Sequence, residues 1–315
     1  MSLEACLPAH LRGPDVRVVR IAAGLSGAGV YRVESAVSAY VLKTGDQTEP
    51  IATWQCRVRI QELAAKAGLA PPLVHVDVEH RAVLSAFVVD RSFPALYFTD
   101  RERALARLGR MLRRVHALPL LPDAPQRDAQ GHLSAIQAEL SGAGFRVPEF
   151  AADAIERALT DEAPTPGRAA VLSHNDVNPT NLLHDGENLL LLDWDAAGAN
   201  EPFYDLATAS VFFRMEEDVC LRLLTAYEGE PVSQLPVRFA YDRRLMAAQC
   251  GANFLNLARR SGHSGARETD TRDATPTLGE FYGRIRAGEL DIATAEGQWA
   301  FGLALLKTSR ETGDV

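Results

Sequence analysis

The most constraining feature of the chain is the segment SHNDVNPTNLLHDGENLLLLDWD, residues 173–195. Its two apolar runs, NLL and NLLLL, are separated by HDGE, and Asp185-Gly186 is a strong turn signal, so the segment predicts a β-hairpin. Antiparallel strands lie about 5 Å apart, so this pairing places Asn181, near the start of the first strand, beside Asp193, near the end of the second. Asp176 precedes Asn181 by five residues. We therefore expect an amide and two carboxylates to form a divalent-cation site next to a potential base.

The composition is that of an ordinary globular chain. It has 315 residues, 47% hydrophobic and 23% charged, enough for two subdomains. No apolar run is long enough to span a bilayer, and the start MSLEACLPAH lacks the basic and apolar regions of a secretion signal. The cysteines lack metal-ligand spacing; they are Cys6, Cys56, Cys220 and Cys250. We expect a cytoplasmic protein with free thiols and no membrane insertion.

The charge pattern bears on the partners. A net charge of −8 argues against a nucleic-acid partner. Between Asp185 and Asp218 there are nine acidic residues and one basic residue, Arg214, which favours a cationic ligand. A solvated acidic surface would give the same pattern, and the two interpretations have similar weight. Nothing in the sequence fixes the oligomeric state.

The first ninety residues are rich in strand signals. Periodicity predicts strands at 16–23, 29–35 and 38–44, a helix at about 53–67, and two further strands before residue 90. We therefore expect residues 1–90 to form a five-stranded antiparallel sheet with one helix.

Beyond residue 90 the pattern becomes helical, apart from the hairpin. In residues 100–118, Leu105, Leu108, Leu112 and Val115 recur at helical spacing. The predicted fold class is α+β, with a small β-rich N-terminal lobe (1–90) and a larger helical C-terminal lobe (91–315). A cleft between two such lobes is a common place for a ligand.

Two features of the N-terminal lobe suggest phosphate binding. The loop GLSGAG, residues 24–29, could cradle phosphate oxygens with its backbone N–H groups, and Ser26 and Gly27 are the candidate contacts. Its spacing differs from that of nucleotide loops, so a plain turn is the alternative. Lys43 ends the third strand and needs a carboxylate or phosphate if it is partly buried. Glu62 is the only acid on the following helix and is the candidate partner of Lys43, with a surface glutamate as the alternative.

Residues 174–181 read H-N-D-x-x-x-x-N, which matches the pattern H-R-D-x-x-x-x-N with Asn175 in place of arginine. In this pattern Asp176 would accept the proton of an attacking hydroxyl, and Asn181 and Asp193 would hold Mg²⁺. We expect His174 to be structural and Asp205, early in a helix, to brace the loop. Asp195 is a second-ligand or cation-contact candidate, weighed against a structural role.

The segment LSHNDVNPTNLL…LLLLDWDAAGANEPFYDLA resembles the choline/ethanolamine kinase branch of the aminoglycoside phosphotransferase superfamily, which has a protein-kinase-like fold. The strong match covers about 171–208, and LSGAGVYRV, YVLK and AGLAPP extend it weakly. The resemblance implies that Asp176 is the base, Asn181 and Asp193 bind Mg²⁺, and Lys43 holds nucleotide phosphates. It also implies that the backbone from Phe87 to Val89 forms the adenine-binding hinge.

The chain departs from that pattern in several places. Thr180 replaces the usual glycine, and Asp195-Ala196 replaces Glu-Tyr. Arg57 stands at about one of the positions where the pattern places the glutamate that pairs with the lysine. The tryptophan-rich stretch that binds choline is missing, so the resemblance specifies the reaction better than the acceptor.

These observations predict an ATP-dependent, Mg²⁺-dependent small-molecule kinase. An amino alcohol of the choline/ethanolamine type is the first acceptor, because the motif match is closest there. An aminoglycoside or other cationic antibiotic is the second. The alternative from another class is a nucleotide-binding pseudokinase.

Overall fold

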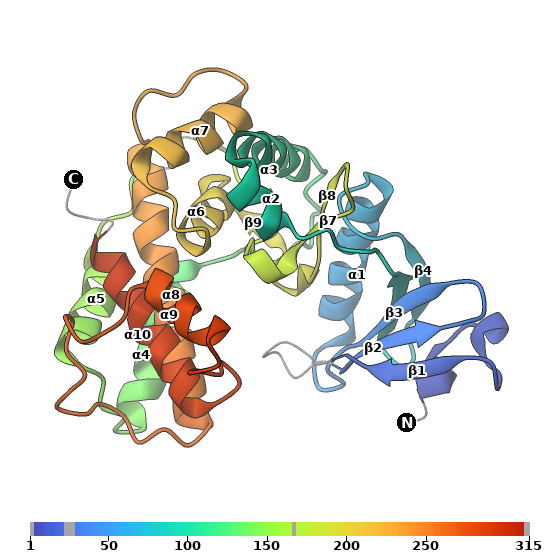
Figure 1. Ribbon diagram of the computed structural model, residues 1–315, viewed down its shortest axis with the longest axis horizontal. Helices are drawn as coiled ribbons and strands as arrows, with labels where there is room; N and C mark the ends of the chain where they lie inside the picture. The colour runs from blue at the N-terminus through green and yellow to red at the C-terminus, as the bar shows by residue number, and fades with distance from the viewer. Residues whose placement is uncertain (1–2, 22–28, 166–167, 312–315) are drawn as a thin grey trace.

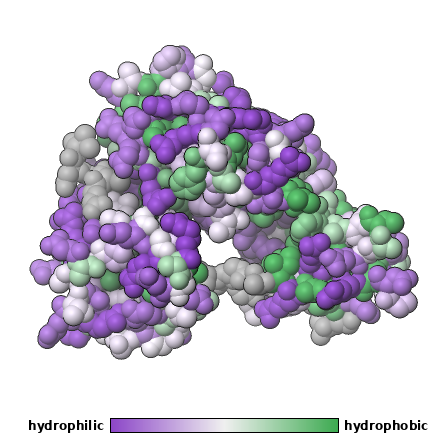
Figure 2. Space-filling view, viewed as in Figure 1, coloured by the Kyte–Doolittle hydropathy of each residue, from purple (hydrophilic) through white to green (hydrophobic). Residues whose placement is uncertain are grey.

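The computed structural model describes residues 3–21, 29–165 and 168–311. It confirms the predicted α+β fold class, with a β-rich region followed by a larger helical region (Figure 1). Figure 2 shows that the viewed face is hollowed between these two regions. Among the described residues, no helix combines the length and apolar character needed to cross a membrane.

The β-rich region contains a five-stranded antiparallel sheet, as the sequence predicts, and the structure gives the strand order β1-β2-β3-β5-β4. The strands are β1 (Arg17–Arg20), β2 (Gly29–Glu34), β3 (Ala39–Thr44), β4 (Leu73–Asp77) and β5 (Ala82–Ala86). Two short 3₁₀ helices, η1 (Leu3–Cys6) and η2 (Ala9–Leu11), precede it, and their buried side chains pack against Val33 and Leu42. The sheet therefore buries apolar side chains against the first residues of the chain.

Helix α1 (Ile51–Lys66) packs in two directions. Trp54 and Val58 contact Val83 of the sheet. Ile60 and other buried residues of the helix belong instead to the large apolar cluster of the helical region. The helix thus joins both regions, and the division of the chain at residue 90 stays a proposal.

The helical region contains nine α-helices among the described residues. They are α2 (Phe93–Thr99), α3 (Arg101–His116), α4 (Ala129–Gly142), α5 (Glu149–Thr160), α6 (Phe203–Phe212), α7 (Glu217–Glu228), α8 (Val237–Arg260), α9 (Leu278–Arg286) and α10 (Ala295–Glu311). The apolar stripe predicted for α3 is buried, and Asp100 caps the helix by accepting a hydrogen bond from the Arg103 amide at 3.2 Å. Helices α4, α5, α8 and α10 share a separate apolar cluster.

The predicted hairpin is present. Strands β7 (Leu182–His184) and β8 (Leu189–Leu191) pair antiparallel, with Leu182 opposite Leu191. The Asp185 carboxylate accepts the amides of Glu187 and Asn188 at 2.8 and 2.7 Å, which closes the turn. Gly186 has a φ of 113°, in the region that favours glycine.

A second small sheet was missed by the sequence analysis. Strands β6 (Val171–Ser173) and β9 (Gly198–Asn200) pair antiparallel on either side of the hairpin. Strands of three residues are too short to show periodicity, so only the tertiary pairing reveals them. This sheet holds both ends of the polar segment together.

The helical region also buries a pair of carboxyl groups. Asp242 of α8 is fully buried, and Glu201 lies within hydrogen-bond reach of it. Burial raises the pKa of Asp242 to about 7, against the opposing effect of Arg238, whose Nε donates to Asp242 at 3.1 Å. A folded-state pKa above the unfolded value means that the contribution to stability is fully present below 3.8 and is lost as the pH rises through about 7.

We expect Asp242→Asn to be more stable than the wild type at alkaline pH, by an amount that grows with pH and levels off above about 7. Each pKa unit corresponds to about 1.4 kcal/mol, so the difference should reach several kcal/mol at most. Melting temperatures across the pH range measure it. Asp153→Asn, which removes an exposed carboxylate paired with Arg310, is the control. A difference from wild type that does not change with pH would contradict the assignment.

Candidate active site

Asp176 lies in the loop after β6, and two amide side chains orient its carboxylate. Asp176 accepts hydrogen bonds from Asn178 Nδ2 and Asn181 Nδ2, each at 2.8 Å. The side-chain oxygen of Asn178 in turn accepts the backbone amides of Thr180 and Asn181, which shapes the turn at Pro179. The structure therefore brings Asp176 and Asn181 together, as the sequence predicts.

The environment of Asp176 makes its carboxylate more basic than that of an ordinary aspartate. Burial raises its pKa, and the nearby charge of Asp193 adds to that effect, while the hydrogen bonds from Asn178 and Asn181 oppose it. A carboxylate with a raised pKa binds a proton more readily than an ordinary aspartate. This is the direction that suits a general base.

Asp193 lies at the exit of the hairpin. The Leu192 amide donates to the Asn181 carbonyl at 2.8 Å, so the hairpin holds Asp193 next to the start of β7. Asp193 has a φ of 60° and a ψ of 68°, an uncommon backbone conformation for a non-glycine residue. Burial raises the pKa of Asp193, but the ammonium of Lys43, together with His174 and a backbone hydrogen bond, makes the net shift downward.

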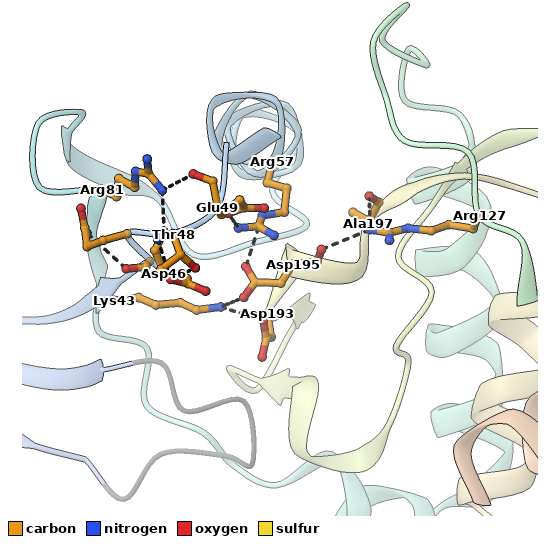
Figure 3. Close-up of polar contacts among 12 residues, drawn as sticks. Lys43, Asp46, Thr48, Glu49, Arg57, Arg81, Arg127, Asp193, Asp195 and Ala197 are labelled. Carbon is orange, nitrogen blue, oxygen red and sulfur yellow. Dashed lines mark hydrogen bonds and ion pairs between the residues drawn. The ribbon is translucent and has the colours of Figure 1, made fainter. Parts of the chain in front are cut away.

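Lys43 of β3 reaches across to the hairpin. Its Nζ lies 2.7 Å from Asp193 Oδ1 and 2.7 Å from Asp195 Oδ2 (Figure 3). Burial alone would lower the pKa of Lys43, but the charges of the two carboxylates raise it overall. The structure thus gathers three of the residues predicted to form the site.

The predicted pairing of Lys43 with Glu62 is wrong in this structure. Within the described chain, the ion pairs of Lys43 are with Asp193 and Asp195. Arg57 is the α1 residue that points toward this group, with its Nε 3.9 Å from Asp195. An α-helix turns about 100° per residue, so Glu62 lies roughly 140° around the helix from Arg57.

His174 has the structural role predicted for it. It is fully buried, and its Nε2 donates to the Leu192 carbonyl at 2.8 Å, while its Nδ1 accepts the Asp176 amide at 3.3 Å. The ring also packs edge-on against Trp194, with 4.8 Å between centroids. One imidazole therefore ties the loop of the candidate base to the exit of the hairpin.

Asp205 of α6 braces the same loop. Its fully buried carboxylate accepts the amides of His174 at 2.8 Å and Asn175 at 2.6 Å. It also pairs with His116 Nε2 at 3.0 Å. Burial would raise the pKa of Asp205, but its hydrogen bond with His116 and the neighbouring charges lower it overall. His116, which lies 89 residues earlier on α3, carried no signal in the sequence.

The remaining candidates concern the nucleotide. Ser26 and Gly27 lie outside the described residues. Phe87 and Val89 follow β5 in the connection to α2, where the Phe87 amide donates to the Ala39 carbonyl at 3.1 Å. Arg32 stacks over the Phe87 ring at 4.4 Å, and Val89 is exposed. The hinge role of this segment stays a prediction.

The oxygen atoms at the site fit Mg²⁺. Asn181 uses its Nδ2 to donate to Asp176, and among the described residues none donates to its Oδ1. Lys43 contacts one carboxylate oxygen of Asp193, and within the described part of the chain the other oxygen has no ion pair. Carboxylate and amide oxygens are the hard ligands that Mg²⁺ prefers, together with phosphates and water.

Comparison with solved structures shows a kinase-like fold over nearly the whole chain. A choline/ethanolamine kinase family protein from Mesorhizobium loti is 18% identical, with a TM-score of 0.58 over 96% of this chain and 94% of that one. A choline kinase from Streptococcus pneumoniae is 16% identical, with a TM-score of 0.60 over 87% and 92%. Spectinomycin phosphotransferase, in complex with ADP and spectinomycin, is 13% identical, with a TM-score of 0.58 over 91% and 93%.

These matches confirm the predicted protein-kinase-like fold. Comparison with curated proteins found no match. A model of the phosphotransferase enzyme family matches residues 17–246, which is most of the chain. The chain therefore belongs to the phosphotransferase enzyme family.

Proposed function

We propose that this phosphotransferase is an ATP-dependent small-molecule kinase that phosphorylates a hydroxyl group of a cationic metabolite, with a choline- or ethanolamine-like amino alcohol as the first acceptor. The observation that carries the proposal is the gathering of Lys43, Asp193, Asn181 and Asp176 at one place between the sheet and the hairpin. A cation for phosphates, two oxygen ligands and a base are the parts that phosphoryl transfer needs.

Each residue has a distinct task in this mechanism. Lys43 would bind phosphate oxygens of the nucleotide, and Asn181 and Asp193 would hold the metal ion. Mg²⁺, when bound, neutralises charge on the phosphates and orients them. Asp176 would accept the proton of the acceptor hydroxyl as that oxygen attacks the γ-phosphorus, and ADP would leave. Positioning and charge neutralisation supply most of the rate in such reactions.

The fixed geometry of the base supports this assignment. Asn178 and Asn181 donate to both carboxylate oxygens of Asp176, and His174 holds its backbone amide. A carboxylate that is already oriented does not have to be ordered when the acceptor binds. The raised pKa of Asp176 also strengthens it as a proton acceptor compared with an ordinary aspartate.

The nucleotide assignment has support from similar structures. A structure of LicA in complex with AMP matches 97% of this chain with a TM-score of 0.58, and the spectinomycin phosphotransferase contains ADP. The amino-alcohol acceptor is supported by the acidic stretch from Asp185 to Asp218 and by the kinases that share the fold. Spectinomycin phosphotransferase matches with the same TM-score as the Mesorhizobium loti protein, which keeps an aminocyclitol or aminoglycoside acceptor as the second candidate.

We expect the purified protein to release ADP from ATP in the presence of a single class of cationic alcohol, and to stop when Mg²⁺ is removed with EDTA. The assay compares choline, ethanolamine, thiamine and an aminoglycoside, with Asp176→Asn as the inactive control. Phosphorylation of the aminoglycoside alone would select the second candidate. If ATP raised the melting temperature equally with and without Mg²⁺, and no acceptor were phosphorylated, the proposal would be refuted and a pseudokinase would be favoured.

A further inference from the structure

Four charged side chains of alternating sign form a continuous row beside the candidate site (Figure 3). Lys43 Nζ lies 2.7 Å from Asp195 Oδ2, and the other oxygen of Asp195 lies 3.9 Å from Arg57 Nε. The guanidinium of Arg57 then pairs with Glu49 through its Nη2. The row runs from β3 through the 3₁₀ helix η4 (Trp194–Ala196) to α1 and to the segment that precedes α1.

The two acidic members of this row are anchored through their backbone. Arg81 donates to the carbonyl groups of Glu49 and, at 2.6 Å, of the neighbouring Asp46. Arg127 Nη2 donates to the carbonyl groups of Asp195 at 3.2 Å and Ala197 at 3.1 Å. Arg57 and Glu49 are also the less exposed members of the row, with 20% and 15% of their side chains exposed. The position of the Asp195 carboxylate is therefore determined by groups on three separate elements.

The proposed function gives Asp193 and Asp195 different roles. In kinases the strand lysine needs an acidic partner to hold it against the phosphates. Asp193 supplies oxygen to the metal ion in the mechanism above, so only one of its carboxylate oxygens is left for Lys43 and its charge is shared with the metal. Asp195 has no such task, and its contact with Lys43 is equally short.

We infer that Asp195 is the positioning partner of Lys43 and that Arg57 holds Asp195 in place. The sequence predicted that helix α1 supplies an acid, Glu62, as the partner of Lys43. Helix α1 instead contributes the cation Arg57, and the acid, Asp195, comes from the exit of the hairpin. Two carboxylates on one ammonium leave an excess of negative charge, which Arg57 offsets. This inference rests on the proposed function, because it assigns Lys43 to the phosphates.

The test measures nucleotide affinity directly, by titration calorimetry with a non-hydrolysable ATP analogue and Mg²⁺, so that no acceptor is required. We expect Asp195→Asn to weaken binding roughly two- to fivefold, as the loss of a partly exposed ion pair allows. Arg57→Gln should weaken it less, and Arg57→Lys should retain most of the affinity. The double variant Asp195→Asn/Arg57→Gln should bind no more weakly than Asp195→Asn alone, because Arg57 acts through Asp195.

Glu187→Gln, an exposed change on the same hairpin, is the matched control and should bind as the wild type does. Melting temperatures without nucleotide check that each variant is folded. Unchanged affinity in Asp195→Asn, or additive losses in the double variant, would overturn the inference. If Asp195→Asn changed only the KM of the acceptor, Asp195 would be an acceptor contact and the inference would fail. A wild type that binds the analogue but turns over no acceptor would refute the proposed function alone.

Discussion

Asp176→Asn should lower turnover by roughly 10²- to 10⁴-fold, the usual contribution of a general base. The amide cannot accept the proton of the acceptor hydroxyl, yet it has nearly the same shape as the carboxylate. Its oxygen can still accept one hydrogen bond from Asn178 or Asn181, so the loop should stay in place. Nucleotide affinity should therefore change little, and the loss should appear in kcat. Steady-state kinetics with the best acceptor, together with calorimetry for the nucleotide, separate the two effects.

The pH dependence of wild-type activity is a second measurement that tests Asp176 as the base. Because burial raises the pKa of Asp176, activity should fall on the acidic side at a pH above its ordinary value of 3.8. Glu187→Gln is the control for both measurements, since it removes an exposed charge from the hairpin without contacting the loop. Wild-type turnover in Asp176→Asn would rule out this aspartate as the base.

Asp205→Ala should reduce the free energy of unfolding by about 3–5 kcal/mol, because each buried hydrogen-bond donor left without an acceptor costs about 1–3 kcal/mol. The carboxylate accepts the backbone amides of His174 and Asn175 and pairs with His116, and its removal leaves these donors buried without an acceptor. Urea denaturation followed by circular dichroism measures the loss. The loop of Asp176 begins at these two amides, so activity should fall together with stability.

Asp205→Asn retains one acceptor oxygen and should therefore lose less stability than Asp205→Ala. Glu156→Ala, which truncates an exposed side chain of α5, is the control and should have little effect. The lowered pKa of Asp205 gives the sign of the pH effect. Its contribution is present above the unfolded pKa and is lost as the pH falls through the lowered folded value. Equal stabilities of Asp205→Ala and wild type would show that the buried carboxylate is not a brace.

The parts of the site that the sequence predicted correctly depend on local chemistry. The hairpin followed from two apolar runs around an Asp-Gly turn, and that turn by itself brings Asn181 toward Asp193. The α+β fold class and the brace by Asp205 likewise came from patterns within single elements. Such features are encoded within a few residues of one another, where periodicity and turn preferences apply.

The parts that were missed depend on contacts between distant segments. The partner of Lys43 lies 152 residues away, and no helical spacing rule could select Asp195 over Glu62. The choice depends on which face of α1 turns toward the hairpin, and apolar packing of the helix in two directions sets that face. The strands β6 and β9 were missed for the same reason, since they pair with each other across the hairpin and β9 also bonds to Pro125 and Arg127.

The bonds from Lys43 to Asp193 and Asp195 join positions 150 and 152 residues apart in the chain. The ammonium comes from the first part of the chain and the carboxylates come from the second, so neither part forms this charge cluster alone. A chimera that exchanges only one of the two parts must therefore keep a cation at position 43 facing the carboxylates at positions 193 and 195. Natural variants should be restricted in the same way.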